Sequence, residues 1–156
     1  VEATGRINYG RYIHDRKGIH GKVILDNGQT QKVLSGWNNY PITLGEKNIP
    51  VQWQALSPQN ANAASCYKGS FTASADADTY LDMRKWNKGL VWVNGHCLGR
   101  FWNIGPTQTM FLPGCWLKKG KNEIIVFDLF GTSNPQMQSL EKPILDEVTI
   151  EVKEKK

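Results

Sequence analysis

KGLVWVNGHCLGRFW, residues 88–102, is the stretch that decides the fold. Residues 90–93 are a short, unbroken apolar run of a kind that favours strands. The dipeptide Asn94-Gly95 follows, and asparagine and glycine are the residues that best tolerate a positive φ. A second run that carries aromatic residues begins at once, so the stretch predicts a β-hairpin that turns at Asn94 and Gly95.

Short strand-like runs, separated by turn signals, continue on both sides of this hairpin. The turn at Asp26-Asn27-Gly28 joins two of them in a second hairpin, and Pro41 limits another to the edge of a sheet. Residues 51–56 fit either a short strand or a single helical turn, and 57–65 and 133–142 read as polar loops. The predicted strands are 22–25, 29–34, 37–44, 66–73, 79–83, 90–93, the run up to Trp102, 109–112, 123–130 and 147–152. The pattern predicts an all-β chain of about eight to ten strands in a two-sheet antiparallel β-sandwich.

Two of the predicted strands are apolar on both faces. In residues 147–152 apolar and polar side chains alternate, as expected for a sheet with one wet face. Residues 90–93 and 124–127 show no such alternation, and Trp92, between Val91 and Val93, is expected in the core. We therefore expect something outside the sandwich, such as a neighbouring domain, to cover the outer side of these two strands.

Length and charge narrow the classes of protein to which this chain can belong. The chain has 156 residues, enough for one domain, and a net charge of +5 from 19 basic and 14 acidic residues. The basic residues are scattered and no nucleic-acid-binding motif accompanies them, which argues against a nucleic-acid partner. No apolar run approaches membrane-spanning length and no signal peptide is present, so no membrane partner is expected. A start at Val1 suggests a processed protein or an excised fragment.

Metal-binding and nucleophile motifs are missing from the sequence. The three cysteines, Cys66, Cys97 and Cys115, have no metal-ligand spacing and allow at most one disulfide. The three histidines form no HExxH or comparable pattern. His96 and Cys97 are adjacent in sequence and would point to opposite faces of a strand, so they are not expected to form a nucleophile and base pair.

Asp76, Asp78 and Asp82 are the densest group of carboxylates. Turn formation accounts for Asp76 and Asp78, and a structural calcium ion held by these two residues is an alternative. A glycosidase that used Asp76 and Asp82 is a third interpretation, which needs the two carboxyl groups to face each other across a sugar.

Aromatic residues are the remaining functional signal, with six Trp, five Tyr and five Phe. A sugar-binding sandwich stacks a ring on a pyranose face and adds polar side chains from its loops. Trp37, Tyr40, Trp53 and Trp102 lie near predicted loops and could serve in this way, or they could be core or interface residues.

The residues from Asp78 to Phe127 read DTYLDMRKWNKGLVWVNGHCLGRFWNIGPTQTMFLPGCWLKKGKNEIIVF. This segment strongly resembles the C-terminal galactose-binding-like jelly roll of the β-galactosidases of glycoside hydrolase family 35. GRINYG at 5–10, DRKGI at 15–19 and YKGSF at 67–71 resemble earlier segments of the same domain. The resemblance implies one jelly-roll domain over residues 1–156, a fragment of a larger bacterial glycosidase that is periplasmic or secreted. Cys97, where a polar residue is expected, and Cys66, where an aromatic residue is expected, depart from the family's pattern.

The same resemblance carries implications for function. In the family, two catalytic glutamates lie on a separate (β/α)₈ barrel, so this chain would be non-catalytic. It would pack against that barrel and a companion sandwich, in an enzyme that removes terminal non-reducing β-galactosyl residues with retention. The alternative is an autonomous carbohydrate-binding module for galactose-containing glycans. Its candidate binding residues are Arg6, Arg16, Trp37, Trp53, Arg100 and Trp102.

Overall fold

The structure is a computed structural model that describes residues 9–14, 16, 18–40, 52–56, 63–105 and 108–145. It divides the chain into an N-terminal unit, Val1–Ile42, and a C-terminal unit, Thr43–Lys156. None of the described residues of the N-terminal unit is buried. The core cluster of buried residues lies in the C-terminal unit.

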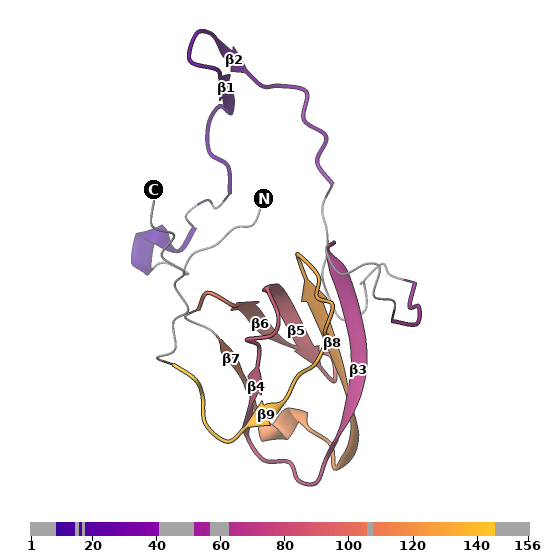
Figure 1. Ribbon diagram of the computed structural model, residues 1–156. Coiled ribbons are helices and arrows are strands. Elements are labelled where there is room, and N and C mark those ends of the chain that lie inside the picture. Colours follow the sequence, from indigo (N-terminus) through magenta and orange to yellow (C-terminus); the bar gives the residue numbers. More distant parts are fainter. Residues whose placement is uncertain are drawn as a thin grey trace, which may run out of the picture. The chain divides into compact units, whose positions relative to one another are not determined.

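The N-terminal unit contains the predicted second hairpin. Strand β1 (Ile24–Asp26) pairs antiparallel with β2 (Gln31–Val33), and a short 3-10 helix, η1 (Gly10–His14), precedes them (Figure 1). Gly28 in the turn has a φ of 84°. The strand predicted at 37–44 is wrong for residues 37–40, which the structure describes without strand geometry. An edge strand gains its hydrogen bonds only from a neighbouring strand, and no described strand pairs with these residues.

The C-terminal unit is a sandwich of two antiparallel sheets, as predicted. The long sheet has the order β3-β8-β5-β6 and the short sheet the order β7-β4-β9 (Figure 1). The strands are β3 (Ser65–Ala73), β4 (Thr79–Asp82), β5 (Lys88–Val93), β6 (His96–Trp102), β7 (Thr109–Leu112), β8 (Gly120–Asp128) and β9 (Ser139–Leu140), with the 3-10 helix η3 (Gly114–Trp116) before β8.

The central hairpin is β5–β6, and it turns where the sequence predicted. Asn94 has a φ of 47° and Gly95 a φ of 86°. The Asn94 amide nitrogen donates to the carbonyl of Trp116 at 2.8 Å and to the side-chain oxygen of Asn122 at 2.8 Å. Its amide oxygen accepts the Glu123 backbone N–H at 3.0 Å. Asn94 therefore both makes the turn and ties it to η3 and β8.

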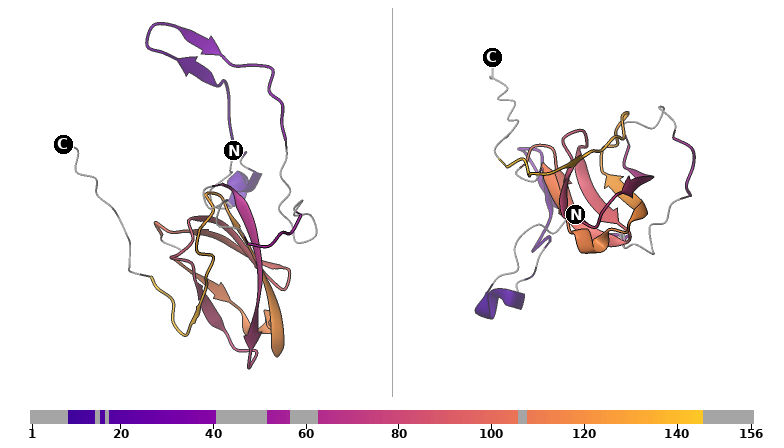
Figure 2. Two further views of the ribbon diagram at one scale, coloured as in Figure 1. Left: turned by 45° about the vertical axis from the view of Figure 1, so that its right-hand side comes forward. Right: turned by 90° about the horizontal axis from the view of Figure 1, so that it is seen from below.

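The two sheets form two layers (Figure 2). Apolar side chains from both sheets meet between these layers. Trp86 is the largest of them, and its indole N–H donates to the carbonyl of Gln136 at 3.0 Å while Tyr67 packs edge-on against its ring. The buried core residues are Leu81, Met83, Trp86, Val91, Val93, Phe101, Met110, Leu112 and Val126.

Several element boundaries differ from the predicted ones. Strand β8 ends at Asp128, two residues before the predicted end, because the buried Asp128 carboxylate accepts the backbone N–H groups of Asn87 and Phe130 and fixes a turn there. The predicted loop 133–142 contains the short strand β9. Residues 52–56 form neither strand nor helix. The predicted strand 147–152 and most of the predicted loop 57–65 lie outside the described residues.

Candidate functional site

The outer face of the long sheet is the face that points away from the core. Val91, Val93 and Val126 belong to the core, so the residues next to them on β5 and β8 point to the outer face, because side chains alternate along a strand. Residues directly opposite each other on paired strands share a face. The strand register therefore gives the arrangement of side chains across the outer face.

Three rows of side chains cross this face. The first row runs Leu129, Lys88, Trp102, with the Leu129 N–H donating to the Lys88 carbonyl at 2.8 Å. The second row runs Cys66, Phe127, Leu90, Arg100, and the third runs Lys68, Ile125, Trp92, Cys97. Apolar or thiol side chains fill most positions of all three rows. The two strands predicted to be apolar on both faces, β5 and β8, form the middle of this face.

Burial on the outer face is uneven. Trp92 is 2% exposed and Ile125 is 8% exposed, whereas Trp102 and Leu129, in the first row, are 42% and 43% exposed. Trp92 is thus buried as predicted, but from the outer face and apart from the core cluster. The outer face carries the kind of side chain that sheets normally turn away from water.

Basic side chains lie along this apolar face. Lys68 pairs with Glu123 at 2.6 Å, and its ammonium group lies 5.6 Å from the centre of the Trp53 ring. The Lys88 ammonium group lies 4.4 Å from the centre of the Trp102 ring. Arg100 is exposed in the second row. The arrangement suits a partner surface that is apolar at its centre and acidic at its edge.

The six candidate sugar-binding residues are divided between the two units of the chain. Arg6 lies outside the described residues, and Arg16 and Trp37 are exposed in the N-terminal unit. In the C-terminal unit Trp53 lies beside β3, at one edge of the long sheet, while Arg100 and Trp102 lie on β6, at the other edge. Arg100 and Trp102 are neighbours, two residues apart on one face of β6.

The aspartates of the predicted cluster are used by the fold. The Asp78 carboxylate accepts the Gly114 backbone N–H at 2.7 Å. Asp82 lies at the other end of β4, about 13 Å further along the chain at the rise of an extended strand. Asp76 precedes Asp78, so Asp76 and Asp82 do not face each other across a sugar. Within the described parts of the chain, no three His, Cys, Asp or Glu side chains are grouped as metal ligands.

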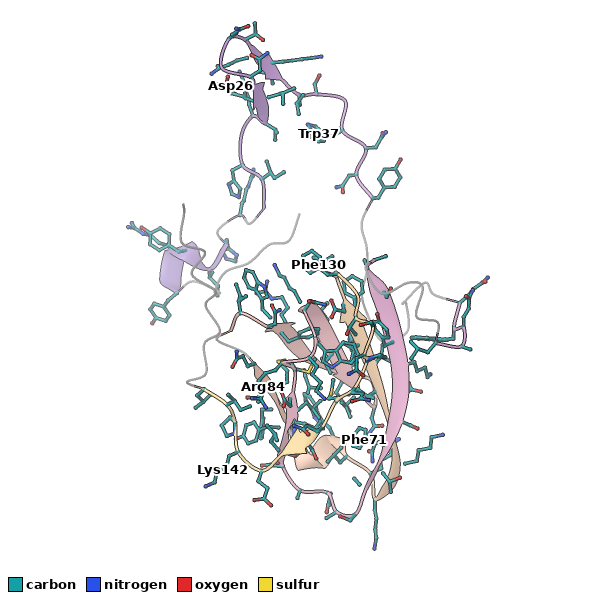
Figure 3. The ribbon with its side chains drawn as sticks, in the orientation of Figure 1. Asp26, Trp37, Phe71, Arg84, Phe130 and Lys142 are labelled. Carbon is teal, nitrogen blue, oxygen red and sulfur yellow. The ribbon has the colours of Figure 1, made fainter. Side chains whose placement is uncertain are left out.

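Asp82 is held as a carboxylate. Two nitrogens of the Arg84 guanidinium donate to its two oxygens at 3.0 and 2.8 Å, and the Gln138 amide donates at 3.1 Å (Figure 3). The hydrogen bond from Arg84 is the main cause that lowers the pKa of Asp82 from 3.8 to about 2. A general acid must carry a proton near neutral pH, so Asp82 cannot fill that role.

A groove of about 1320 Å³, which the sequence analysis did not predict, opens along β3. Core side chains, among them Tyr67, Phe71 and Trp86, line it together with residues 52–56. The short sheet ends at β9, which has two residues, and so leaves part of the inner face of β3 uncovered. The groove is an open flank of the core, and Cys66, Lys68 and Asp78 are among the residues that line it.

The sequence matches two family models. Residues 64–122 match the model described as "Beta-galactosidase, galactose-binding domain", and residues 1–43 match "Beta-galactosidase, first all-beta domain". The two matches fall on the C-terminal and N-terminal units respectively. The resemblance to β-galactosidase domains is therefore confirmed, but residues 5–10 and 15–19, which were expected in the galactose-binding-like domain, fall within the match to the first all-beta domain.

Curated proteins that are similar to this chain are also named β-galactosidase or β-galactosidase-like. The chain is 36% identical over 151 residues to beta-galactosidase-1-like protein 2 of Homo sapiens, and 33% identical over 153 residues to beta-galactosidase 1 of Dictyostelium discoideum. These alignments cover 93% and 94% of the chain, but only 23% and 22% of the two relatives. A beta-galactosidase of Xanthomonas manihotis is 38% identical over 113 residues, which are 72% of the chain and 18% of that protein. The chain thus spans less than a quarter of these relatives.

Proposed function

From its membership in the domain families of β-galactosidases, we propose that the C-terminal unit is a packing domain of a larger β-galactosidase. It performs no chemistry of its own, and it docks through the outer face of the long sheet on the catalytic barrel and the companion sandwich of the same polypeptide. The complete enzyme would remove terminal non-reducing β-D-galactosyl residues. The names of the relatives and the short share of their length that the chain spans support this proposal.

The observation that carries the docking surface is the set of three rows on the outer face. A sheet face that meets water normally has polar side chains, whereas here the partly buried Phe127 and Leu90 occupy its centre, beside Ile125 and Trp92, which are already buried in this chain. Burying apolar area contributes about 25 cal/mol per Å², so covering this face with another domain is favourable. Lys68 and Arg100 at its sides would orient an acidic partner surface.

A charge placed in the middle of this face tests the proposal. In the larger protein, Leu90→Lys should lower the free energy of unfolding by about 2 kcal/mol or more, and lower the galactosidase activity with it, because the charge would be buried in the interface. In this chain alone the same substitution should change stability little, since Leu90 points away from the core.

Ser70→Lys is the matched control, because Ser70 is exposed on the same face of β3 next to the third row. Ser70→Lys should leave the free energy of unfolding unchanged, both in this chain alone and in the larger protein. An equal effect of Leu90→Lys on the chain alone and on the larger protein would mean that the outer face packs within the chain, and the docking surface would be abandoned.

Binding of galactosyl glycans is a second candidate function, and one observation favours it. Arg100 and the 42% exposed Trp102 lie on the same face of β6 and could offer a ring and a hydrogen-bond donor to a sugar. Calorimetric titration with galactose, lactose and a β-galactan oligosaccharide, with and without calcium, tests it. Saturable heat that Trp102→Ala removes and Trp53→Ala leaves intact would establish a sugar site, whereas no heat with folded protein would leave the packing role alone.

A further inference from the structure

We propose that the turn of the β1–β2 hairpin is a self-modifying site, in which Asn27 deamidates by attack of the Gly28 backbone nitrogen on its side chain. Asp26 is the base that takes the proton of the Gly28 nitrogen, and the backbone N–H groups of residues 29 and 30 polarise the Asn27 side-chain carbonyl. The product is an aspartate or an isoaspartate at position 27, and the reaction needs no enzyme.

The sequence contains two Asn-Gly dipeptides, at residues 27–28 and 94–95. Glycine makes a preceding asparagine prone to deamidation, because glycine has no β-carbon to hinder the approach of its own backbone nitrogen to the asparagine side chain. The two dipeptides therefore share the same intrinsic chemistry. Their surroundings in the folded chain decide which of them reacts.

The Asp26 carboxylate is bound to the nitrogen that would attack. One carboxylate oxygen accepts the Gly28 backbone N–H at 2.8 Å, and the other accepts the Gln31 side-chain amide at 2.8 Å, which fixes the orientation of the group (Figure 3). A base can act in a reaction when it lies within hydrogen-bond distance of the proton that it removes. The Gly28 hydrogen bond is also the main cause that lowers the pKa of Asp26, so near neutral pH the group is a carboxylate that can accept a proton.

The Asn27 side chain is held by donors that favour the attack. Its carbonyl oxygen accepts the Thr30 backbone N–H at 2.8 Å, the Gln29 backbone N–H at 3.0 Å and the Thr30 hydroxyl at 3.2 Å. Negative charge develops on this oxygen when a nitrogen adds to the side-chain carbon, and fixed N–H donors stabilise such charge. Asn27 and Gly28 are both exposed, so ammonia can leave the turn and water can enter it.

Water is the only other reactant that the modification needs. A bond forms between the Gly28 nitrogen and the side-chain carbon of Asn27, the bond from that carbon to the amide nitrogen breaks, and ammonia leaves with the proton that Asp26 took from Gly28. Water then opens the resulting succinimide at one of its two carbonyl groups, which gives aspartate or isoaspartate. Either product adds a second carboxylate beside Asp26, and isoaspartate lengthens the backbone by one atom between β1 and β2.

Asn94 provides the contrast, because its side chain is bound within the core sheet. Its amide nitrogen, which would have to leave, donates to the Trp116 carbonyl and to the Asn122 side-chain oxygen, each at 2.8 Å. Its amide oxygen accepts the Glu123 backbone N–H at 3.0 Å. Attack at Asn94 therefore requires the β5–β6 hairpin to open, and the opening of core strands costs a large share of the free energy of unfolding. We expect Asn27 to react and Asn94 to be protected.

Peptide mass spectrometry after incubation near neutral pH measures the rate of deamidation at both asparagines, in the folded chain and in guanidinium chloride. Asn27 should react at least about 3-fold faster in the folded chain than in the unfolded one, because the base and the N–H donors are positioned only in the turn. Asn94 should react at least about 100-fold more slowly in the folded chain, because it reacts only after opening. Fragmentation of the peptide that contains position 27 distinguishes aspartate from isoaspartate.

Asp26→Ser removes the base and leaves a hydroxyl that can accept a hydrogen bond in the turn. It should lower the rate at Asn27 in the folded chain at least about 3-fold and leave the rate in the unfolded chain unchanged. Lys32→Ser, on β2, is the control and should change neither rate. A slower reaction of Asn27 in the folded chain than in the unfolded one, equal rates at Asn27 and Asn94 in the folded chain, or an unchanged rate in Asp26→Ser would each overturn the proposal.

Discussion

At the scale of single residues, two carboxylates that the sequence offered for chemistry, Asp78 and Asp82, act as structural anchors, and so does Asp128. The Asp82 carboxylate accepts hydrogen bonds from the side chains of Arg84 and Gln138. The Asp78 carboxylate accepts one from the backbone of Gly114, and the fully buried Asp128 accepts one from the backbone of Asn87. Sequence spacing alone could not separate these roles from catalysis, because an anchor and a general acid both require a partly buried carboxylate. The two roles are distinguished by the hydrogen-bond partner of each carboxylate oxygen, and only the structure identifies these partners.

The ion pair of Asp82 predicts an acid-dependent loss of stability. Its pKa is lowered from 3.8 to about 2 in the folded protein, so the folded state favours the charged form. This contribution, about 2 kcal/mol, is complete above a pH of about 4 and disappears as the pH falls through about 2. Asp82→Asn should therefore destabilise the chain at pH 7 and flatten the pH dependence of the unfolding free energy between pH 4 and 2, as measured by urea denaturation.

Glu123→Gln provides the control for this experiment. Glu123 also forms an ion pair, with Lys68, but both side chains are more than 40% exposed, so water screens the interaction. Glu123→Gln should lower the free energy of unfolding by less than about 1 kcal/mol at pH 7. A steep acid transition that persists in Asp82→Asn would assign the acid sensitivity to another group.

Two strand glycines predict opposite responses to one added methyl group. A β-carbon on Gly89 would collide with the backbone carbonyl of Phe127 and would lie 3.1 Å from the Phe101 ring. On Gly69 it would meet only the Ile124 side chain, at an ordinary 3.6 Å. Gly89→Ala should therefore cost at least about 3 kcal/mol or prevent folding, and Gly69→Ala less than about 0.5 kcal/mol, in chemical denaturation. Similar stabilities of the two variants would contradict the close contact of β5 and β8.

At the scale of elements, the sequence predicted turns and strand type well and strand partners poorly. The Asn94-Gly95 and Asn27-Gly28 turns formed as expected, because a positive φ is a local requirement that residue identity reveals. The edge strand expected at 37–44 failed over residues 37–40, since a strand also needs a neighbour. The two-residue strand β9 was missed inside a polar loop, because its pairing with Tyr80 and Leu81 is a long-range contact.

The two Asn-Gly turns share a positive φ at glycine and have different surroundings, which gives a matched pair of substitutions. Gly95 has a φ of 86° and Gly28 a φ of 84°, so valine is strained at either position. Gly95→Val should lower the stability of the C-terminal unit by roughly 1–3 kcal/mol, because its turn joins two strands of the core sheet. Gly28→Val should leave the thermal unfolding of that unit unchanged. Tryptophan fluorescence during heating measures both, and equal shifts would contradict the separation of the two hairpins.

At the scale of the whole molecule, the sequence predicted the fold class but not the division of the chain. The alternation of apolar and polar residues shows which face of a strand is apolar. Which core that face packs into depends on contacts between residues far apart in the sequence. The exposed Ile24 and Val33 read in sequence like the buried Val91 and Val93. The doubly apolar strands β5 and β8 are the sequence signal on which the proposed cover of the outer face rests.

The division into two units predicts that the C-terminal unit folds without the N-terminal one. All residues of the core cluster lie between Leu81 and Val126, and none of the described residues before 41 is buried. Removal of residues 1–42 should therefore change the free energy of unfolding by less than about 0.5 kcal/mol, in calorimetry of the shortened chain. Removal of residues 127–156 is the contrasting control and should abolish folding, because it deletes Asp128, β9 and the carbonyl of Gln136 that accepts from Trp86. A large loss of stability from the first deletion would show instead that the C-terminal core depends on the N-terminal unit, and that the chain folds as the single domain its sequence first suggested.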